Sequence, residues 1–160
     1  MPAPLTTYQT LILPEWTDYN GHLRDAFYLL VFSYATDALM DHLGLDSAHR
    51  EASGHSLFTL ECHLNYLHEV RQGSRVQVRT QLLGHDHKRL HLYHSLHLGA
   101  AAQSLAASEQ LLLHVALGGA DGARSAAFSG EVARRIEALG NAHRHLPRPA
   151  WTGRVIGLPA

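Results

Sequence analysis

Several classes of protein are excluded by what this chain of 160 residues has little of. Cys62 is the single cysteine, so an internal disulfide is impossible and a reducing compartment is favoured. No apolar run reaches membrane-spanning length, and the first residues, MPAPLTTYQT, lack the basic and apolar regions of a signal peptide. We therefore expect a cytoplasmic protein without a membrane partner.

Charged residues are also scarce. They make up 17% of the chain and leave a formal net charge of −1, which argues against a general nucleic-acid-binding protein. Hydrophobic residues make up 46%, which is ordinary for a globular protein and too high for a disordered one. The length suits one domain with its own hydrophobic core, and the sequence shows neither an internal repeat nor a second domain.

The first third of the chain predicts a strand, a polar turn and a long helix. Residues 8–13 read as a short strand that a proline ends. Residues 26–43 form an apolar helical run, with Asp25 placed to cap its start and Gly44 placed to end it. Because this run is apolar around most of its circumference, we expect the helix to be buried on nearly all sides. Residues 46–54 are polar and predict a loop.

From residue 56 onward, apolar and polar residues alternate with the period of half-buried strands. The pattern predicts four long strands, over residues 56–67, 75–83, 88–98 and 105–115. In the first of them, Phe58 and Cys62 fall on one face, and Glu61 and His63 fall on the other. We expect an antiparallel meander that forms a curved sheet around one long central helix, which is an α+β fold.

The character of the sequence changes near its end. Residues 118–122 are a glycine-rich connection, and residues 129–139 predict a short helix with Ser129 as its cap, followed by a proline-containing tail. We expect residues 1–117 to form the main unit and residues 118–160 to be a C-terminal extension of the same domain.

The residues between the first strand and the long helix carry the most specific pattern. Residues 17–28, TDYNGHLRDAFY, resemble the Asp-x-x-Gly-His-x-x-x-x-x-Tyr signature of hot-dog-fold acyl-CoA thioesterases of the 4-hydroxybenzoyl-CoA type, with Tyr28 as its last residue. The order of a strand, a long helix and four strands over residues 8–115 is similar as well. The segments TLECHLNYL, TQLLGHDHKRLHLYH and LLLHV resemble one branch of this family, the thioesterases linked to carnitine and betaine breakdown. The chain departs from the family at Arg24 and Asp25, where two asparagines are frequent.

This resemblance implies a hot-dog fold and the hydrolysis of a small acyl-CoA thioester, betainyl-CoA in the branch just named. It implies no cofactor, and a homodimer or homotetramer with sites between subunits. A bare sheet edge also favours pairing of the strand over residues 56–67 across a two-fold axis. Two alternatives stay open: a non-catalytic acyl-CoA-binding hot-dog protein and a hot-dog dehydratase. A serine or cysteine hydrolase is not expected, because Ser56, Ser108 and Cys62 lack the sequence context of a nucleophile.

The turn itself offers the groups that thioester hydrolysis needs. Asp18 can attack the thioester directly or act as a general base on water. The first free backbone N–H groups of the helix, near Asp25, can polarise the carbonyl, and Gly21 lets the backbone come close to a ligand. His22 either orients Asp18 or stabilises the turn. The simpler alternative is that Asp18 only forms an Asx turn, without a catalytic role.

Candidates for contacts with the acyl group come from the turn and from the strand over residues 56–67. They are Trp16, Tyr19, Asn20, Gly21, Glu61 and His63. If the helix packs on the face that carries Glu61 and His63, aromatic rings and a carboxylate meet at one pocket, which suits a quaternary ammonium ion. The alternative is that Trp16 packs beside the turn and that Glu61 is an exposed or salt-bridged strand residue.

Lys88 and Arg89 are the candidates for contacts with CoA. They lie beside a tight turn at the start of a strand, where arginine and lysine suit phosphate groups. The alternative is an ordinary solvated turn.

The chain has 14 histidines, several of them close together in sequence. His91 and His97 share a strand face but lie about 20 Å apart, whereas metal ligands need bonds of about 2 Å. We therefore expect no metal site. His94 falls on the leucine face of its strand, which predicts a partnered histidine within the core or a subunit contact.

Overall fold

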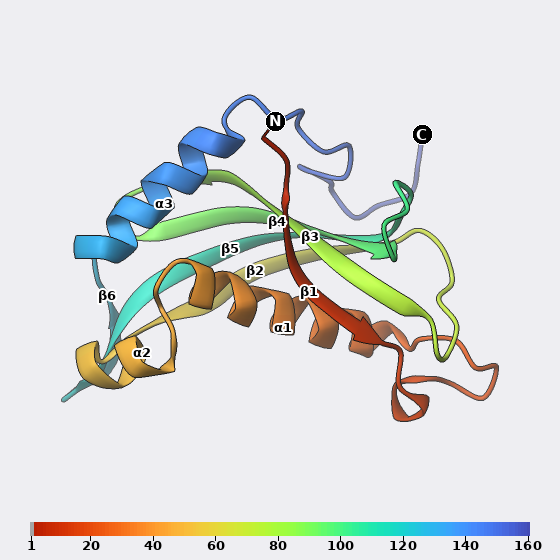
Figure 1. Ribbon diagram of the computed structural model, residues 1–160, viewed down its shortest axis with the longest axis horizontal. Coiled ribbons are helices and arrows are strands. Elements are labelled where there is room, and N and C mark those ends of the chain that lie inside the picture. Colours follow the sequence, from red (N-terminus) through yellow and green to blue (C-terminus); the bar gives the residue numbers. More distant parts are fainter. Residues whose placement is uncertain (1) are drawn as a thin grey trace.

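The computed structural model describes residues 2–160, which fold into one curved sheet with helices (Figure 1). The elements in chain order are β1 (Leu5–Leu11), a short 3-10 helix η1 (Pro14–Trp16), α1 (Asp25–His42), α2 (Ser47–Ser53), β2 (His55–Tyr66), β3 (Arg75–His85), β4 (Arg89–Leu98), β5 (Ser104–Gly119), β6 (Gly122–Ser125) and α3 (Gly130–His143). Within residues 2–160, none of the helices is both long and apolar enough to cross a membrane.

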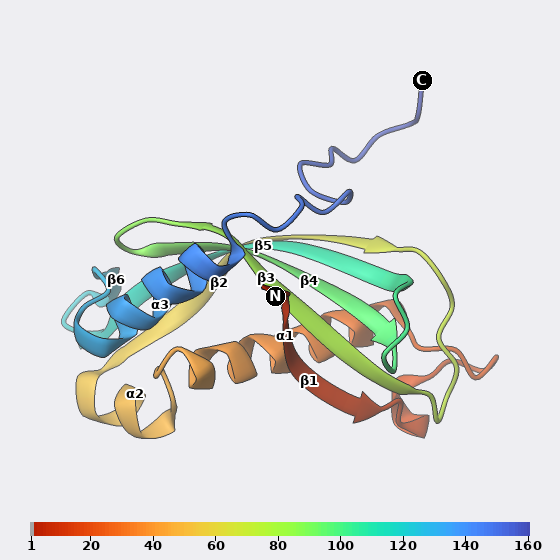
Figure 2. The same cartoon turned by 45° about the horizontal axis from the view of Figure 1, so that its top comes forward.

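The strands form a sheet in the order β1-β3-β4-β5-β2, with all neighbours antiparallel and β6 added beside β5. The sheet curves around α1, which lies along its inner face (Figures 1 and 2). The predicted α+β hot-dog fold is therefore confirmed. The predicted meander holds for β3, β4 and β5 but is wrong for β2, because β1 and not β2 pairs with β3, and β2 pairs with β5.

A β-bulge in β2 decides which of its residues face α1. The register with β5 shifts between Thr59 and Glu61, which leaves Leu60 as the extra residue. Thr59 and Cys62 line a cavity together with residues of α1, so they face inward, and the alternation of the strand turns Phe58 outward. The prediction that Phe58 and Cys62 share a face is wrong, because a strict period of two does not reveal a bulge.

The helix α1 begins within one residue of its predicted start, but its cap differs. Arg24 occupies the N-cap position, and its side chain makes no capping hydrogen bond but donates from Nε to the Thr17 carbonyl at 3.2 Å. Asp25 is instead the first helical residue, and its carboxylate accepts a hydrogen bond from the Ala26 N–H at 2.8 Å. The carboxylate therefore still satisfies one of the free N–H groups at the helix start.

One strip of α1 is not buried within the chain. Leu29, Ser33 and Asp37 are exposed, and they line the same cavity as Thr59 and Cys62 of β2. The prediction that α1 is buried on nearly all sides is therefore wrong along this strip, because β2 is the edge of the sheet and no further strand of residues 2–160 covers the helix there.

A buried polar network centred on His94 crosses the core. His94 Nε2 lies 2.9 Å from the Thr36 hydroxyl of α1, and Nδ1 lies 2.8 Å from the Thr80 hydroxyl of β3. Thr80 also reaches the Thr7 hydroxyl of β1 at 2.8 Å, and the imidazole stacks on Phe32. Burial lowers the pKa of His94 to about 3, so the ring is neutral. The predicted partnered histidine within the core is confirmed.

The C-terminal helix α3 covers the end of the core. Ser129 occupies its N-cap position as predicted, although without a side-chain hydrogen bond, and the helix runs on to His143. Its apolar residues pack with the C-terminal half of α1, namely Val132, Ile136 and Leu139. The sequence did not predict β6 or α2. In α2 the residues are polar and show no apolar period, and its start is fixed by the Asp46 carboxylate, which accepts from the His49 N–H at 2.9 Å.

Candidate active site

The predicted catalytic turn is a tightly bonded loop between η1 and α1. The Asp18 N–H donates to the His22 carbonyl at 2.9 Å, and the Gly21 N–H donates to the Asp18 carbonyl at 3.0 Å. Asp18 Oδ1 accepts from the N–H groups of Asn20 and His22 at 2.9 and 3.1 Å. Gly21 has a φ of +75°, which favours glycine. The Asx turn considered as the simpler alternative is therefore present, and it holds the carboxylate in one orientation.

The same backbone donors set the charge of Asp18. The hydrogen bond from the His22 N–H is the largest cause that lowers the pKa of Asp18, and the Asn20 N–H adds to it, while burial opposes both. The carboxylate is therefore ionised at neutral pH. No group within residues 2–160 bonds to Oδ2, so this oxygen is free to attack a carbonyl carbon or to take a proton from water.

The start of α1 follows the turn directly and carries an unpaired donor. The Arg24 N–H donates to the Trp16 carbonyl at 3.0 Å, and the Ala26 N–H is taken by the Asp25 carboxylate. The Asp25 N–H has no hydrogen-bond partner among the described residues, and Asp25 is exposed. An unpaired N–H at the N-terminus of a helix is able to stabilise an oxyanion.

The linker between β2 and β3 closes over the turn. The Leu23 N–H donates to the Val70 carbonyl at 2.8 Å, and His22 Nε2 lies 3.4 Å from Glu69 Oε2. The His22 backbone N–H holds the Asp18 carboxylate. Both roles considered for the His22 side chain, orienting Asp18 and stabilising the turn, stay predictions. Sequence reasoning missed Glu69, which lies in a linker without periodicity.

A cavity of about 310 Å³ opens beside the start of α1. Two tyrosines line it, with the rings of Tyr28 and Tyr66 at 89° and their centroids 5.1 Å apart. The Tyr66 hydroxyl donates to the Asp25 carbonyl at 3.2 Å, and the Tyr28 hydroxyl donates to the His68 carbonyl at 3.3 Å. Glu69 is part of the same wall. The sequence analysis named neither tyrosine as a site residue.

The residues that flank Asp18 in sequence differ in burial. Trp16 is 8% exposed, and its ring stacks on Phe27 with centroids 6.2 Å apart, so it packs beside the turn. Tyr19 is 93% exposed, and Asn20 is exposed as well. The roles of Trp16, Tyr19 and Asn20 as substrate contacts stay predictions.

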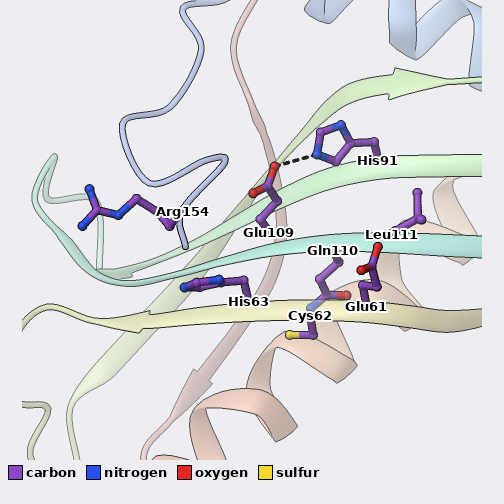
Figure 3. Close-up of a pocket in the computed structure, with 8 residues that line it drawn as sticks. All are labelled: Glu61, Cys62, His63, His91, Glu109, Gln110, Leu111 and Arg154. Carbon is purple, nitrogen blue, oxygen red and sulfur yellow. Dashed lines mark hydrogen bonds and ion pairs between the residues drawn. The ribbon is translucent and has the colours of Figure 1, made fainter. Parts of the chain in front are cut away.

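Glu61 and His63 lie on the outer face of the sheet, away from α1 (Figure 3). Figure 3 shows Cys62, between them in sequence, pointing to the side where α1 runs. The pocket for a quaternary ammonium ion considered from the sequence required α1 to pack on the face that carries Glu61 and His63. The helix packs on the other face, so this requirement is not met. The bulge at Leu60 explains the error, because it places both Thr59 and Cys62 on the inner face.

The outer cavity has a volume of about 490 Å³ and is bounded by the C-terminal tail. Glu109 accepts from His91 Nε2 and from the Gly153 N–H, both at 2.7 Å, and Arg154 completes one wall. Figure 2 shows the tail on the opposite side of the sheet from α1. Although histidines and carboxylates meet here, no group of three metal-ligating side chains in residues 2–160 is placed to hold an ion.

Lys88 lies in the tight turn between β3 and β4, and Arg89 is the first residue of β4. The Asp86 carboxylate accepts from the N–H groups of Lys88 and Arg89 at 3.0 and 2.7 Å and from Arg89 Nε at 2.7 Å, and the Arg89 side chain is the largest cause that lowers the pKa of Asp86. The next residue, Leu90, packs with the C-terminal half of α1. Within one chain, this turn and the Asp18 turn are therefore separated by the length of α1, roughly 27 Å.

A sheet wrapped around a helix, with an ionised aspartate held at the start of that helix, defines a hot-dog protein suited to acyl transfer to water. Residues 12–136 match the sequence profile of the Thioesterase-like superfamily, and the chain belongs to this superfamily. It is an acyl-CoA thioesterase. This result confirms the thioesterase prediction over the non-catalytic binding protein and the dehydratase.

Individual relatives agree with this assignment. The chain is 71% identical to a betainyl-CoA thioesterase of Pseudomonas aeruginosa, over 99% of this chain and 98% of that protein. It is 40% identical to an L-carnitine dehydrogenase/betainyl-CoA thioesterase of Agrobacterium fabrum, over 96% of this chain but 30% of that longer protein. A solved structure of a Staphylococcus aureus protein in complex with CoA has a TM-score of 0.87 and 26% identity, over 98% of this chain and 97% of that one.

Proposed function

We propose that this thioesterase hydrolyses betainyl-CoA to betaine and CoA, with Asp18 as the reacting carboxylate. The observation that carries the proposal is the 71% identity to a betainyl-CoA thioesterase over nearly the full length of both chains. Because the identity is this high, we place the hydrolysis of the same thioester at the turn around Asp18 and the start of α1. The ionised carboxylate and the unpaired Asp25 N–H support it.

The reaction needs two groups of this chain. Asp18 Oδ2 either attacks the thioester carbonyl carbon or removes a proton from the water that does so. If Asp18 attacks, a mixed anhydride forms as the C–S bond breaks, and water then cleaves the anhydride and regenerates the Asp18 carboxylate. If Asp18 acts as a base, water adds to the carbonyl carbon and the C–S bond then breaks. In both cases CoA leaves as the thiol after taking up a proton, and one water molecule is consumed. The Asp25 N–H stabilises the negative charge that develops on the carbonyl oxygen.

The complete site is assigned to a homodimer. The β2 edge and the exposed strip of α1 beside it are uncovered within one chain, and pairing of two β2 strands across a two-fold axis would cover both. Antiparallel pairing places the start of one β2 beside the end of the other. The Lys88 and Arg89 turn lies at the end of the sheet where β2 starts, so the partner's copy of this turn comes toward the Asp18 turn and can meet the CoA phosphates.

The substrate is tested with two thioesters of the same shape. Betainyl-CoA and 3,3-dimethylbutanoyl-CoA differ only in a quaternary nitrogen in place of a quaternary carbon. We expect kcat/KM to be at least ~10-fold higher for betainyl-CoA, because a site that accepts the cation stabilises its charge. CoA release with a thiol reagent measures both rates. Equal rates, or a preference for the neutral ester, would contradict the proposed substrate and leave the thioesterase assignment intact.

A further inference from the structure

The position of the reacting carbonyl restricts where a charged acyl group can lie. In betainyl-CoA the nitrogen is two bonds from the carbonyl carbon, a separation of about 2.5 Å. A carbonyl oxygen held by the Asp25 N–H therefore places the trimethylammonium group beside Asp25 itself. Glu61 and His63 point from the opposite face of the sheet and do not border this position in the chain.

The cavity beside Asp25 has the chemistry that a quaternary ammonium ion requires. Tyr28 and Tyr66 meet at a right angle and form a corner, and Asp25 and Glu69 stand on its rim. Tyr66 is 50% exposed, so its ring is accessible, whereas Tyr28 is 5% exposed and forms the back of the corner. Aromatic faces attract a cation that cannot donate hydrogen bonds, and a carboxylate balances its charge.

The tyrosines are fixed in place, and their surroundings are negative. Their hydroxyls donate to backbone carbonyls of Asp25 and His68, which orients both rings. Burial is the largest cause that raises the pKa of each tyrosine, and the charge of Glu69 for Tyr28 and of Asp25 for Tyr66 adds to it. A cation in the corner would meet these two carboxylates.

The corner is also connected to the catalytic turn. Glu69 Oε2 lies 3.4 Å from His22 Nε2, and the His22 N–H holds Asp18. Leu23, which follows His22, lines the cavity. The cavity of about 310 Å³ lies at the lower limit of typical ligand pockets, which suits a small acyl group.

We infer that Tyr66, Tyr28 and Glu69 form the subsite for the quaternary ammonium group of the acyl chain. Tyr66 supplies the accessible ring face, Tyr28 closes the corner behind the methyl groups, and Glu69 balances the positive charge. This inference rests on the proposed substrate, and it replaces the pocket of Trp16 and Glu61 expected from the sequence.

The test compares the ratio of kcat/KM for betainyl-CoA to that for 3,3-dimethylbutanoyl-CoA across variants. A change that only damages the fold or the reacting groups lowers both rates and leaves the ratio unchanged. We expect Tyr66→Leu to lower the ratio about 5- to 30-fold, the scale of a desolvated cation–π contact. Tyr66→Phe keeps the ring and should keep the ratio within about twofold.

Glu69→Gln and Glu61→Gln are a matched pair of carboxylate changes. The Glu69 side chain is 77% exposed, so its replacement should not disturb folding. We expect Glu69→Gln to lower the ratio about 3- to 10-fold, and Glu61→Gln on the outer face to leave it unchanged.

Three results would overturn the inference in distinguishable ways. A parent enzyme without preference for betainyl-CoA would contradict both the proposed substrate and the proposed subsite. A parent that has the preference and keeps it in both Tyr66→Leu and Glu69→Gln would remove the subsite alone. A loss of preference in Glu61→Gln but not in Glu69→Gln would indicate that the cation binds near Glu61 on the outer face of the sheet.

Discussion

At the scale of single residues, His94 shows how this core tolerates a titratable group. It is fully buried, both ring nitrogens have hydroxyl partners, and its ring stacks on Phe32. Since a neutral imidazole has one donor and one acceptor nitrogen, Thr36 and Thr80 must take opposite roles toward it. A proton on His94 would place a buried charge between two hydroxyls, which explains why burial lowers its pKa to about 3.

This lowered pKa predicts a loss of stability in mild acid. Between about pH 6.5 and about pH 3 the unfolded chain binds a proton at His94 that the folded chain does not, so the free energy of unfolding falls as the pH falls. One such group contributes about 1.4 kcal/mol per pH unit within that window and nothing above it. Burial lowers the pKa in the same direction at His97, His114 and His143.

Urea unfolding of the parent and of His94→Gln from pH 4 to pH 8 measures this contribution. The variant should be less stable at pH 8, because it disturbs two buried hydroxyls, and its stability should fall less steeply below pH 6. Above pH 7 the difference between the two proteins should be constant. Parallel curves over the whole range would show that His94 does not titrate as described.

The sequence was informative about residues whose local pattern determines their role. Asp18 and Gly21 were predicted from a short signature, because an Asx turn depends on neighbours in sequence. Tyr66 and Glu69 were missed, because their place beside Asp25 depends on which end of β2 meets the start of α1. A strand pattern fixes a face and says nothing about which helix end lies below it.

At the scale of elements, β2 is an edge strand with one side unpaired within residues 2–160. Its 12 residues pair with β5 along one edge, and the other edge faces no strand within residues 2–160. Phe58 and Leu60 are 43% and 51% exposed along it. An edge this long and apolar is normally covered in a native protein.

We expect light scattering at micromolar concentration to give a dimer or tetramer for the parent. Leu60→Glu should shift it toward monomer, because two like charges would meet near the two-fold axis, and should lower kcat/KM at least ~10-fold if the partner completes the site. Leu98→Glu is a matched control, since Leu98 is also 51% exposed but belongs to β4. A parent that is monomeric and fully active would rule out the proposed assembly.

The sequence predicted most elements well and their pairing less well. The start of α1 and the strand cores follow from local apolar periods, which are visible in sequence. The pairings of β2 with β5 and of β1 with β3 are long-range contacts that no local pattern contains. The short helix α2 was taken for a loop because a capping aspartate, and not an apolar face, starts it.

At the scale of the whole molecule, the two proposed parts of the site lie at the two ends of α1. The Asp18 turn and the corner formed by Tyr28 and Tyr66 lie at the start of α1. The turn with Lys88 and Arg89 lies toward its C-terminal end. A CoA thioester needs both a reacting end and a phosphate-binding end, so an antiparallel dimer is the simplest arrangement that brings them together. A single sequence could indicate the Asp18 turn and the turn with Lys88 and Arg89. It could not indicate that the first turn of one chain meets the second turn of its partner in the proposed dimer.

Asp18→Asn is the sharpest test of the proposed role of Asp18 in thioester hydrolysis. The amide oxygen can still accept from the Asn20 and His22 N–H groups, so the turn and the melting temperature should be nearly unchanged. Asp46→Asn is the matched control, because Asp46 also accepts a backbone N–H but caps α2. With betainyl-CoA we expect Asp18→Asn to lower kcat by about 10² or more, and Asp46→Asn to leave it within about twofold. An Asp18→Asn enzyme that hydrolyses the ester at the parent rate would contradict the account.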